Sequence, residues 1–199
     1  MDGNNFNWFN YECYRLYDWL RFDQFINNMK STYNLAKLPP ADEMPPTVTY
    51  MGNMYNSNQV ITTPWCSNYI TNMHNTYRNC RNLTGNPVCG PNVTHMYSTY
   101  YWCNRIYGDA VCGPNVTNMG YTYYGCNNLN GSPACGDNVV NMTGTYYMCP
   151  NLSGNPVCGN NVLDMSRAYY RCQNLTGNPV CGPNVTNMSS TYENCTNYW

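Results

Sequence analysis

The side chains in this sequence with the widest range of chemistry are its cysteines. Thirteen of the 199 residues are Cys, and twelve of these form two series in which every step is 23 residues. The first cysteine series is Cys66, Cys89, Cys112, Cys135, Cys158 and Cys181. The second cysteine series is Cys80, Cys103, Cys126, Cys149, Cys172 and Cys195. Repeated thiols could bind metal, act as nucleophiles, form disulfides or pack as small apolar side chains.

Metal binding and catalysis fit this spacing poorly. Zinc sites use close pairs such as C-x₂-C, whereas the separations here alternate between 14 and 9 residues, and His74 and His95 are not repeated. A catalytic cysteine belongs to one unique constellation of side chains, but these cysteines are copies of one another. We therefore expect no catalytic residue, no metal site and no cofactor, and a protein that is not an enzyme.

Disulfides and free thiols both remain open from the residues alone. Bridges could join the two series within a unit, as Cys66–Cys80, or between units, as Cys80–Cys89. They could also join neighbours within one series, because adjacent strands lie within the Cα spacing that a disulfide allows. The presence of two series favours pairing and an oxidising location.

The cysteine spacing belongs to a repeat of the whole unit, because other residue types keep the same 23-residue step without insertion or deletion. These include Met73, Met96, Met119, Met142, Met165, Met188 and Tyr77, Tyr100, Tyr123, Tyr146, Tyr169, Tyr192. A unit this short cannot bury its own apolar face, so units must stack and place each side chain over its copy. The pattern predicts a repeat solenoid of about six coils in residues 46–199.

Glycine and proline also recur at fixed places in the unit. Gly85 and Gly90, with their copies, are expected to permit sharp turns with positive φ. Pro87 precedes a Val-Cys pair and cannot donate a backbone hydrogen bond, so we expect a parallel strand of only about these two residues. The segment from Met to the second Cys is expected to form one helical or 3₁₀ turn.

The unit Leu175–Cys195, and above all its part Asn184-Val-Thr-Asn-Met-Ser-Ser-Thr-Tyr-Glu-Asn-Cys195, resembles the BspA-type leucine-rich repeat. The resemblance covers about residues 60–199, with Tyr where that family usually has Phe and with an additional Cys after the strand. It implies a leucine-rich-repeat-like solenoid in surface-exposed binding or adhesion proteins of bacteria, related protists and their viruses. It also implies that the second cysteine series is buried as free thiols.

The two ends of the chain differ from the repeat. Apolar residues of 1–45 have the spacing of one helix face, which predicts an α-helical N-terminal cap and linker. Residues 47–65 are expected to be a degenerate first coil. In it, Val60 stands at the leucine position, one step before Leu83, and Trp65 stands at the valine position, one step before Val88. At the other end, Tyr198 and Trp199 could dock a partner or another copy, or fold over the last coil.

Two further ladders of side chains are expected on the surface. Tyr101, Tyr124, Tyr147 and Tyr170 each follow a core tyrosine directly, so they should face outwards as a stripe. Such a stripe could bind sugar rings or a protein, although packing of the stripe against itself is the interpretation we favour. Asn92 and its copies should form a structural ladder in which amides satisfy one another. We interpret the ten Asn-x-Ser/Thr triplets, Asn92 among them, as by-products of the composition.

Composition narrows the function. The net charge is −1, and ten of the nineteen charged residues lie in residues 1–43, so a basic nucleic-acid footprint is missing. We expect neither membrane insertion nor a signal peptide, because neither pattern occurs. We expect a surface recognition or adhesion scaffold for a protein or glycan, such as a phage-borne receptor-binding or tail-associated protein. The alternative is a structural subunit of a virion or extracellular fibre that oligomerises through its C-terminal end. The expected location is extracellular, the cell surface or a virion.

Overall fold

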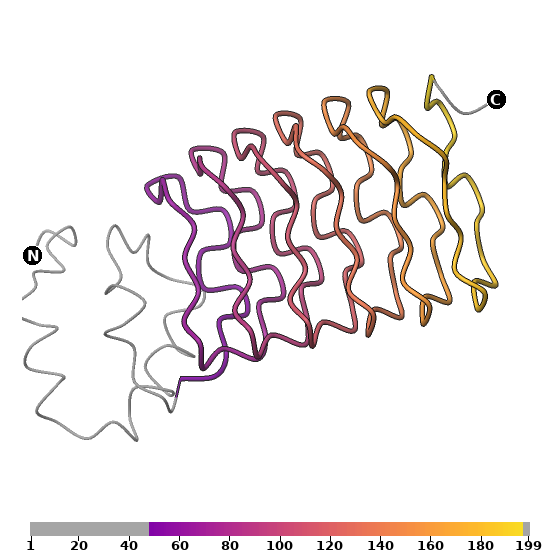
Figure 1. Cartoon of the computed structure of the whole chain (residues 1–199). Helices are drawn as coiled ribbons and strands as arrows, with labels where there is room; N and C mark the ends of the chain where they lie inside the picture. Colours follow the sequence, from indigo (N-terminus) through magenta and orange to yellow (C-terminus); the bar gives the residue numbers. More distant parts are fainter. Residues whose placement is uncertain (1–47, 197–199) are drawn as a thin grey trace, which may run out of the picture.

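The structure is a computed structural model that describes residues 48–196. Figure 1 shows this part of the chain as a row of similar coils that lie side by side, in sequence order, along one axis. The helical cap expected in residues 1–45, and the docking end expected at Tyr198 and Trp199, lie outside the described residues. The assignment of the coils to the leucine-rich-repeat class stays a prediction.

Residues 48–196 contain no helix, and their β-structure consists of isolated single-residue bridges. None of the described residues forms a helix long and apolar enough to cross a membrane. One parallel bridge joins each coil to the next at the residue before the repeated Met: Tyr50, Asn72, His95, Asn118, Asn141, Asp164 and Asn187. The coils are therefore in register with one another at this edge.

The segment from Met73 to Cys80 is a row of overlapping β-turns and not the expected helical or 3₁₀ turn. The N–H groups of Thr76, Arg78 and Cys80 donate to the carbonyl three residues earlier, at 3.1, 3.3 and 3.0 Å. The alternate N–H groups donate to the next coil, as Tyr77 does to the Thr99 carbonyl at 2.9 Å. Because successive N–H groups donate alternately within the coil and to the next coil, the segment satisfies its own backbone and also joins two coils. A continuous helix would use all of these N–H groups within itself.

The core consists of vertical ladders of identical side chains. The second cysteine series is buried in successive coils, as are the repeated Met from Met73 to Met165 and the core tyrosines from Tyr77 to Tyr169. A further buried series is Leu83, Ile106, Leu129, Leu152 and Leu175. From Tyr55 to Tyr192, neighbouring core tyrosine rings stack with centroids 5.3–5.5 Å apart. Because each coil supplies only one layer, the apolar area that stabilises it is shared with the coils on either side.

The expected strand at the Val-Cys pair is wrong, because a core tyrosine occupies its backbone groups. The Tyr100 hydroxyl accepts from the Val88 N–H at 2.9 Å and donates to the Val88 carbonyl at 2.8 Å. The same double contact recurs at Trp65, Val111, Ala134 and Val157. This contact across the coil requires the tyrosine hydroxyl, which a phenylalanine would lack.

The repeated glycines serve two different purposes. Gly85 and its copies Gly108, Gly154 and Gly177 have φ between 81 and 93°, as expected for sharp turns. The expectation is wrong for the copy Gly131 and for Gly90 and the other glycines that follow the first cysteine series, none of which has positive φ. At Gly159, a Cβ atom would lie 2.7 Å from the carbonyl oxygen of Gly136 in the preceding coil. Glycine is needed there because the backbones of two coils approach closely.

The first described coil is shorter by one residue, so its predicted register is partly wrong. Ile61 packs against the core, whereas Val60 is 47% exposed. The side chain of Asn58 accepts hydrogen bonds from both their N–H groups, at 2.7 and 2.9 Å. Trp65 does occupy the valine position, since it makes the double contact with the Tyr77 hydroxyl.

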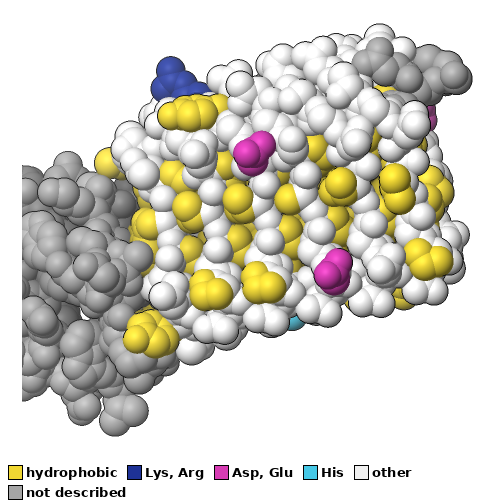
Figure 2. All heavy atoms as spheres, viewed as in Figure 1, with side chains coloured by type: hydrophobic (Ala, Val, Ile, Leu, Met, Phe, Trp, Pro, Cys, Tyr) yellow, Lys and Arg dark blue, Asp and Glu magenta, His cyan; other side chains and the backbone are white. Residues whose placement is uncertain are grey.

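Charged side chains are scarce on the outside of the coils. Figure 2 shows hydrophobic side chains in regular rows across one face, with few charged side chains among them. A cluster of charge on this stack therefore marks a local departure from the repeat.

Candidate ligand-binding groove

The expected tyrosine stripe packs against itself. The rings of Tyr101, Tyr124, Tyr147 and Tyr170 stack with centroids 4.6, 4.5 and 4.5 Å apart and interplanar angles of 16, 2 and 9°. All four side chains are half-buried. Because neighbouring rings cover one another's faces, the stripe offers solvent mainly ring edges and hydroxyl groups.

A guanidinium group lies at each end of the stripe. The Cζ atom of Arg78 is 4.1 Å from the ring centroid of Tyr101, and that of Arg171 is 5.4 Å from the ring centroid of Tyr170. Both distances suit cation–π attraction. Arg78 occupies the stripe position of the preceding coil, so the sequence could have indicated this charge as a break in the tyrosine series.

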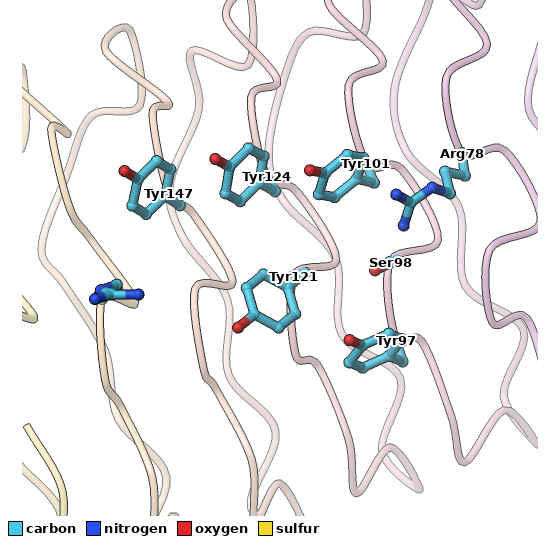
Figure 3. Close-up of a pocket in the computed structure, with 8 residues that line it drawn as sticks. Arg78, Tyr97, Ser98, Tyr101, Tyr121, Tyr124 and Tyr147 are labelled. Carbon is cyan, nitrogen blue, oxygen red and sulfur yellow. The ribbon is translucent and has the colours of Figure 1, made fainter. Parts of the chain in front are cut away.

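A groove of about 370 Å³ runs beside the stripe. Figure 3 shows Tyr101, Tyr124 and Tyr147 in a row along one side, with Tyr121 and Tyr97 opposite them and Arg78 at one end. Its lining is Arg78, Tyr97, Ser98, Tyr101, Tyr121, Tyr124, Tyr147 and Arg167. Three tyrosines of the predicted stripe therefore belong to one wall, whereas Tyr170 does not line the groove.

The opposite wall was missed by the sequence reasoning, because its residues are not copies of one another. Tyr97 and Tyr121 follow Met96 and Met119 by one and two residues, at positions that other coils fill with small or polar side chains. Their rings meet edge to face, with centroids 5.6 Å apart and an interplanar angle of 80°. A search for single departures from the repeat, instead of ladders, could have found them.

Glycines make room for this wall. A Cβ atom at Gly120 would lie 3.1 Å from Cδ2 of Tyr97, and one at Gly144 would lie 2.8 Å from Cδ1 of Tyr121. Each ring therefore lies across a glycine of the next coil. Tyr121 itself has φ of 55°, a left-handed conformation that a bulky residue adopts only where its surroundings stabilise it.

The groove is rich in hydrogen-bond donors and positive charge. It is lined by two guanidinium groups, and no carboxylate lines it. Burial raises the pKa of Tyr124, and its neighbours Tyr101 and Tyr147 raise that pKa further. The hydroxyl of Tyr124 therefore stays protonated at neutral pH. Without an imidazole or carboxylate in its lining, the groove has no ordinary general base.

The twelve described cysteines are free thiols. In the second cysteine series, each thiol donates to the backbone carbonyl of a core tyrosine in the preceding coil, as Cys126 does to Tyr100 at 3.0 Å. The other distances are 2.8–3.0 Å. Burial raises the pKa of Cys80 to about 12 and that of Cys66, in the first cysteine series, to about 11. Such thiols are poor nucleophiles at neutral pH.

No group of three or more His, Cys, Asp or Glu side chains in residues 48–196 could hold a metal ion. The predicted asparagine ladder exists, but its amides do not satisfy one another. Each donates to a backbone carbonyl 24 residues earlier, as Asn92 does to Asn68 at 2.7 Å. The copies Asn115, Asn138, Asn161 and Asn184 do the same at 2.8–2.9 Å. The amide nitrogens of the Asn-x-Thr triplets at Asn92, Asn115 and Asn184 are therefore part of the contacts between coils.

The groove thus brings unrepeated aromatic and cationic side chains together around one cavity. The chain matches no protein-family model, no curated protein and no solved structure.

Proposed function

We propose that this protein is a non-enzymatic recognition scaffold that binds an elongated ligand along the tyrosine-lined groove. The observation that carries the proposal is the groove itself, where five tyrosines and two arginines from successive coils surround about 370 Å³. Tyrosine and arginine are the side chains most enriched among the residues that dominate binding energy. A surface recognition or adhesion protein is also what the likeness to the BspA-type repeat implies.

The coils support binding because they position the groove before a ligand arrives. Tyr124 is held by stacking on Tyr101 and Tyr147, and Arg78 is held against Tyr101. Side chains that are already ordered lose little conformational entropy on binding. The same side chains lack the acid–base groups that a reaction would require, which favours recognition over catalysis.

The proposal is tested by removing one ring without disturbing the coil. Tyr121→Asn deletes the ring, and Asn tolerates the left-handed backbone at this position. Tyr107→Asn is the control, because Tyr107 is exposed and does not line the groove. In a screen of oligosaccharides and surface proteins, we expect a ligand whose affinity falls at least about tenfold in Tyr121→Asn only. A ligand that binds both variants equally well, or no ligand at all, would contradict the proposal.

A second candidate function, a subunit that assembles end to end, is favoured by the last described coil. Met188 is 41% exposed and Val180 is 62% exposed, whereas the preceding copy Met165 is fully buried. Light scattering of the full chain distinguishes this candidate. Association that increases with concentration and is abolished by Met188→Glu would support it, whereas a monomer at all concentrations would exclude it.

A further inference from the structure

We infer that the groove binds an acidic linear glycan, whose carboxylate or sulfate groups meet Arg78 and Arg167 while its hydroxyl groups meet the tyrosines. This inference rests on the proposed recognition function and names the ligand class of the same groove. Three properties of the lining support this ligand class: its charge, its length, and the contacts that it can still make.

The positive charge of the lining favours an anionic ligand. Arg78 and Arg167 both line the groove, and no Asp or Glu does. The carboxylate of Asp164 does not line the groove, and it accepts hydrogen bonds from the Ser166 N–H at 2.7 Å and the Asn187 amide at 3.1 Å. Two positive charges in a chain whose net charge is −1 form a local field that favours anionic ligands.

The length of the lining calls for more than one sugar ring. Arg78 and Arg167 belong to coils that are four steps apart in the repeat. At about 4.8 Å per step, the backbone positions of the two arginines are about 19 Å apart along the stack. One small anion cannot contact both guanidinium groups, so the ligand must be a chain with acidic groups at intervals.

The remaining contacts favour a glycan over a nucleic acid. Single-stranded nucleic acids bind aromatic residues through base stacking, which needs exposed ring faces. In the stripe, Tyr124 is stacked between Tyr101 and Tyr147. The outer face of Tyr101 meets Arg78 and that of Tyr147 meets Tyr170, so hydroxyl groups and ring edges remain. The rings that carry these hydroxyl groups repeat with centroids 4.5–4.6 Å apart, and each hydroxyl group can donate to and accept from the hydroxyl groups of a sugar chain.

The contacts also favour a glycan over an extended peptide. A peptide that adds a strand requires unpaired backbone groups at an edge. The backbone around the groove is already paired between coils, as Ser98 is with the Gly120 carbonyl at 2.9 Å and Tyr121 with the Thr143 carbonyl at 2.8 Å. The groove therefore offers side chains and no free strand edge.

The experiment measures the affinity of the full chain for a set of probes of matched length. A heparin octasaccharide presents sulfate and an oligogalacturonate presents carboxylate, so the two arms separate the sources of negative charge. A neutral dextran oligosaccharide, a polyglutamate peptide and oligo-dT are the alternatives. We expect at least one acidic glycan to bind best, and more tightly at low salt, because salt screens exposed charges.

Variants then assign the binding to the groove. Arg78→Gln and Arg167→Gln should each weaken binding of the acidic glycan about tenfold, because each removes a charge-assisted hydrogen bond. The control is Arg105→Gln, since Arg105 is exposed outside the groove and its Nη1 atom contacts Asn82 at 3.3 Å. This control should bind like the unmodified chain.

The possible failures are distinguishable. If dextran binds as well as the acidic glycans and only Tyr121→Asn weakens it, the acidic ligand is wrong and the recognition function stands. If polyglutamate or oligo-dT binds in the groove and the glycans do not, the glycan class is wrong. If no probe or screened ligand depends on Tyr121, both the inference and the proposed function fail.

Discussion

At the scale of single residues, the hydroxyl of the core tyrosine replaces a missing strand. Pro87 cannot donate a hydrogen bond, and the following residue Val88 has its N–H and carbonyl bound by Tyr100. A phenylalanine would fill the same volume but would leave two backbone groups without their partner. An unsatisfied buried group costs about 1–3 kcal/mol. The hydroxyl therefore contributes substantially to the contact between the segment that contains Val88 and the segment that contains Tyr100.

A matched pair of variants tests this role. Tyr123→Phe removes the contact with the Val111 N–H, at 3.0 Å, and with its carbonyl, at 2.8 Å. We expect the free energy of unfolding to fall by about 2–4 kcal/mol. The adjacent Tyr124→Phe removes a half-buried surface hydroxyl and should cost less than about 0.5 kcal/mol. Urea unfolding measures both values, and equal losses would show that the contact with Val111 does not stabilise the coil.

The thiols of the second cysteine series act at the same scale. Tyr100 has a carbonyl that accepts both the Cys103 N–H at 2.9 Å and the Cys126 thiol at 3.0 Å. A disulfide at Cys126 would remove that S–H donor. In the structure, the thiols of the second cysteine series act as hydrogen-bond donors between coils, and this role does not require a disulfide. The sequence alone left open whether these cysteines are paired or free.

At the scale of the element, two kinds of glycine limit how the coils are built. Gly159→Ala would place a Cβ atom 2.7 Å from the Gly136 carbonyl oxygen, so two backbones would have to separate. At Gly85, φ is 93° but the nearest atom would lie 4.0 Å away. Both glycines recur in the same repeat, yet only at Gly159 would an added Cβ atom clash with a neighbouring coil.

We therefore expect Gly159→Ala to be the more harmful of the two substitutions. It should lower the free energy of unfolding by about 2–3 kcal/mol through overpacking. Gly85→Ala should cost about 1 kcal/mol, because the only penalty is a left-handed Ala. Thermal unfolding followed by circular dichroism compares them. The reverse order would mean that backbone conformation, and not the distance between coils, determines which residue is tolerated.

The element scale also shows what the sequence could predict. The 23-residue step indicated which residues lie above one another, as Met73, Met96 and the core tyrosines do. It could not indicate where coils exchange hydrogen bonds, because the Val-Cys pair has the residue types of a strand, and only the position of the Tyr100 hydroxyl excludes one. The step pairs Tyr97 with Gly120 and Tyr121 with Gly144, but it could not indicate that the two rings would lie opposite the stripe and enclose a groove.

At the scale of the whole molecule, almost every contact joins a coil to itself or to an adjacent coil. The bridges connect residues 22 or 23 positions apart from Tyr50 to Asn187, with one further bridge between Gly85 and Ile106. In such a stack, stability is close to a sum of the coils and of the interfaces between neighbours. Removing or adding one coil should therefore change the free energy of unfolding by the contribution of one coil and its interface, provided that the register between coils is kept.

Removal of one complete coil tests this expectation. Deletion of residues 162–184 joins Asn161 directly to Val185, which restores the Asn-Val junction found between the other coils. The 23 residues removed equal one step of the repeat, so Met188 then lies over Met142 as Met165 does now. We expect a folded chain that unfolds cooperatively at a modestly lower temperature.

Deletion of residues 162–183 is the matched control, because it removes one residue fewer and leaves Asn184 before Val185. The remaining coil is then out of register by one position, so a polar side chain faces the ladders of Met and Val. Burying a polar group without a hydrogen bond costs a few kcal/mol. We therefore expect this deletion to unfold at a lower temperature than the deletion of one complete coil. If both deletions unfold at the same temperature, the interfaces between coils do not require the register that the bridges from Asn72 to Asn187 define.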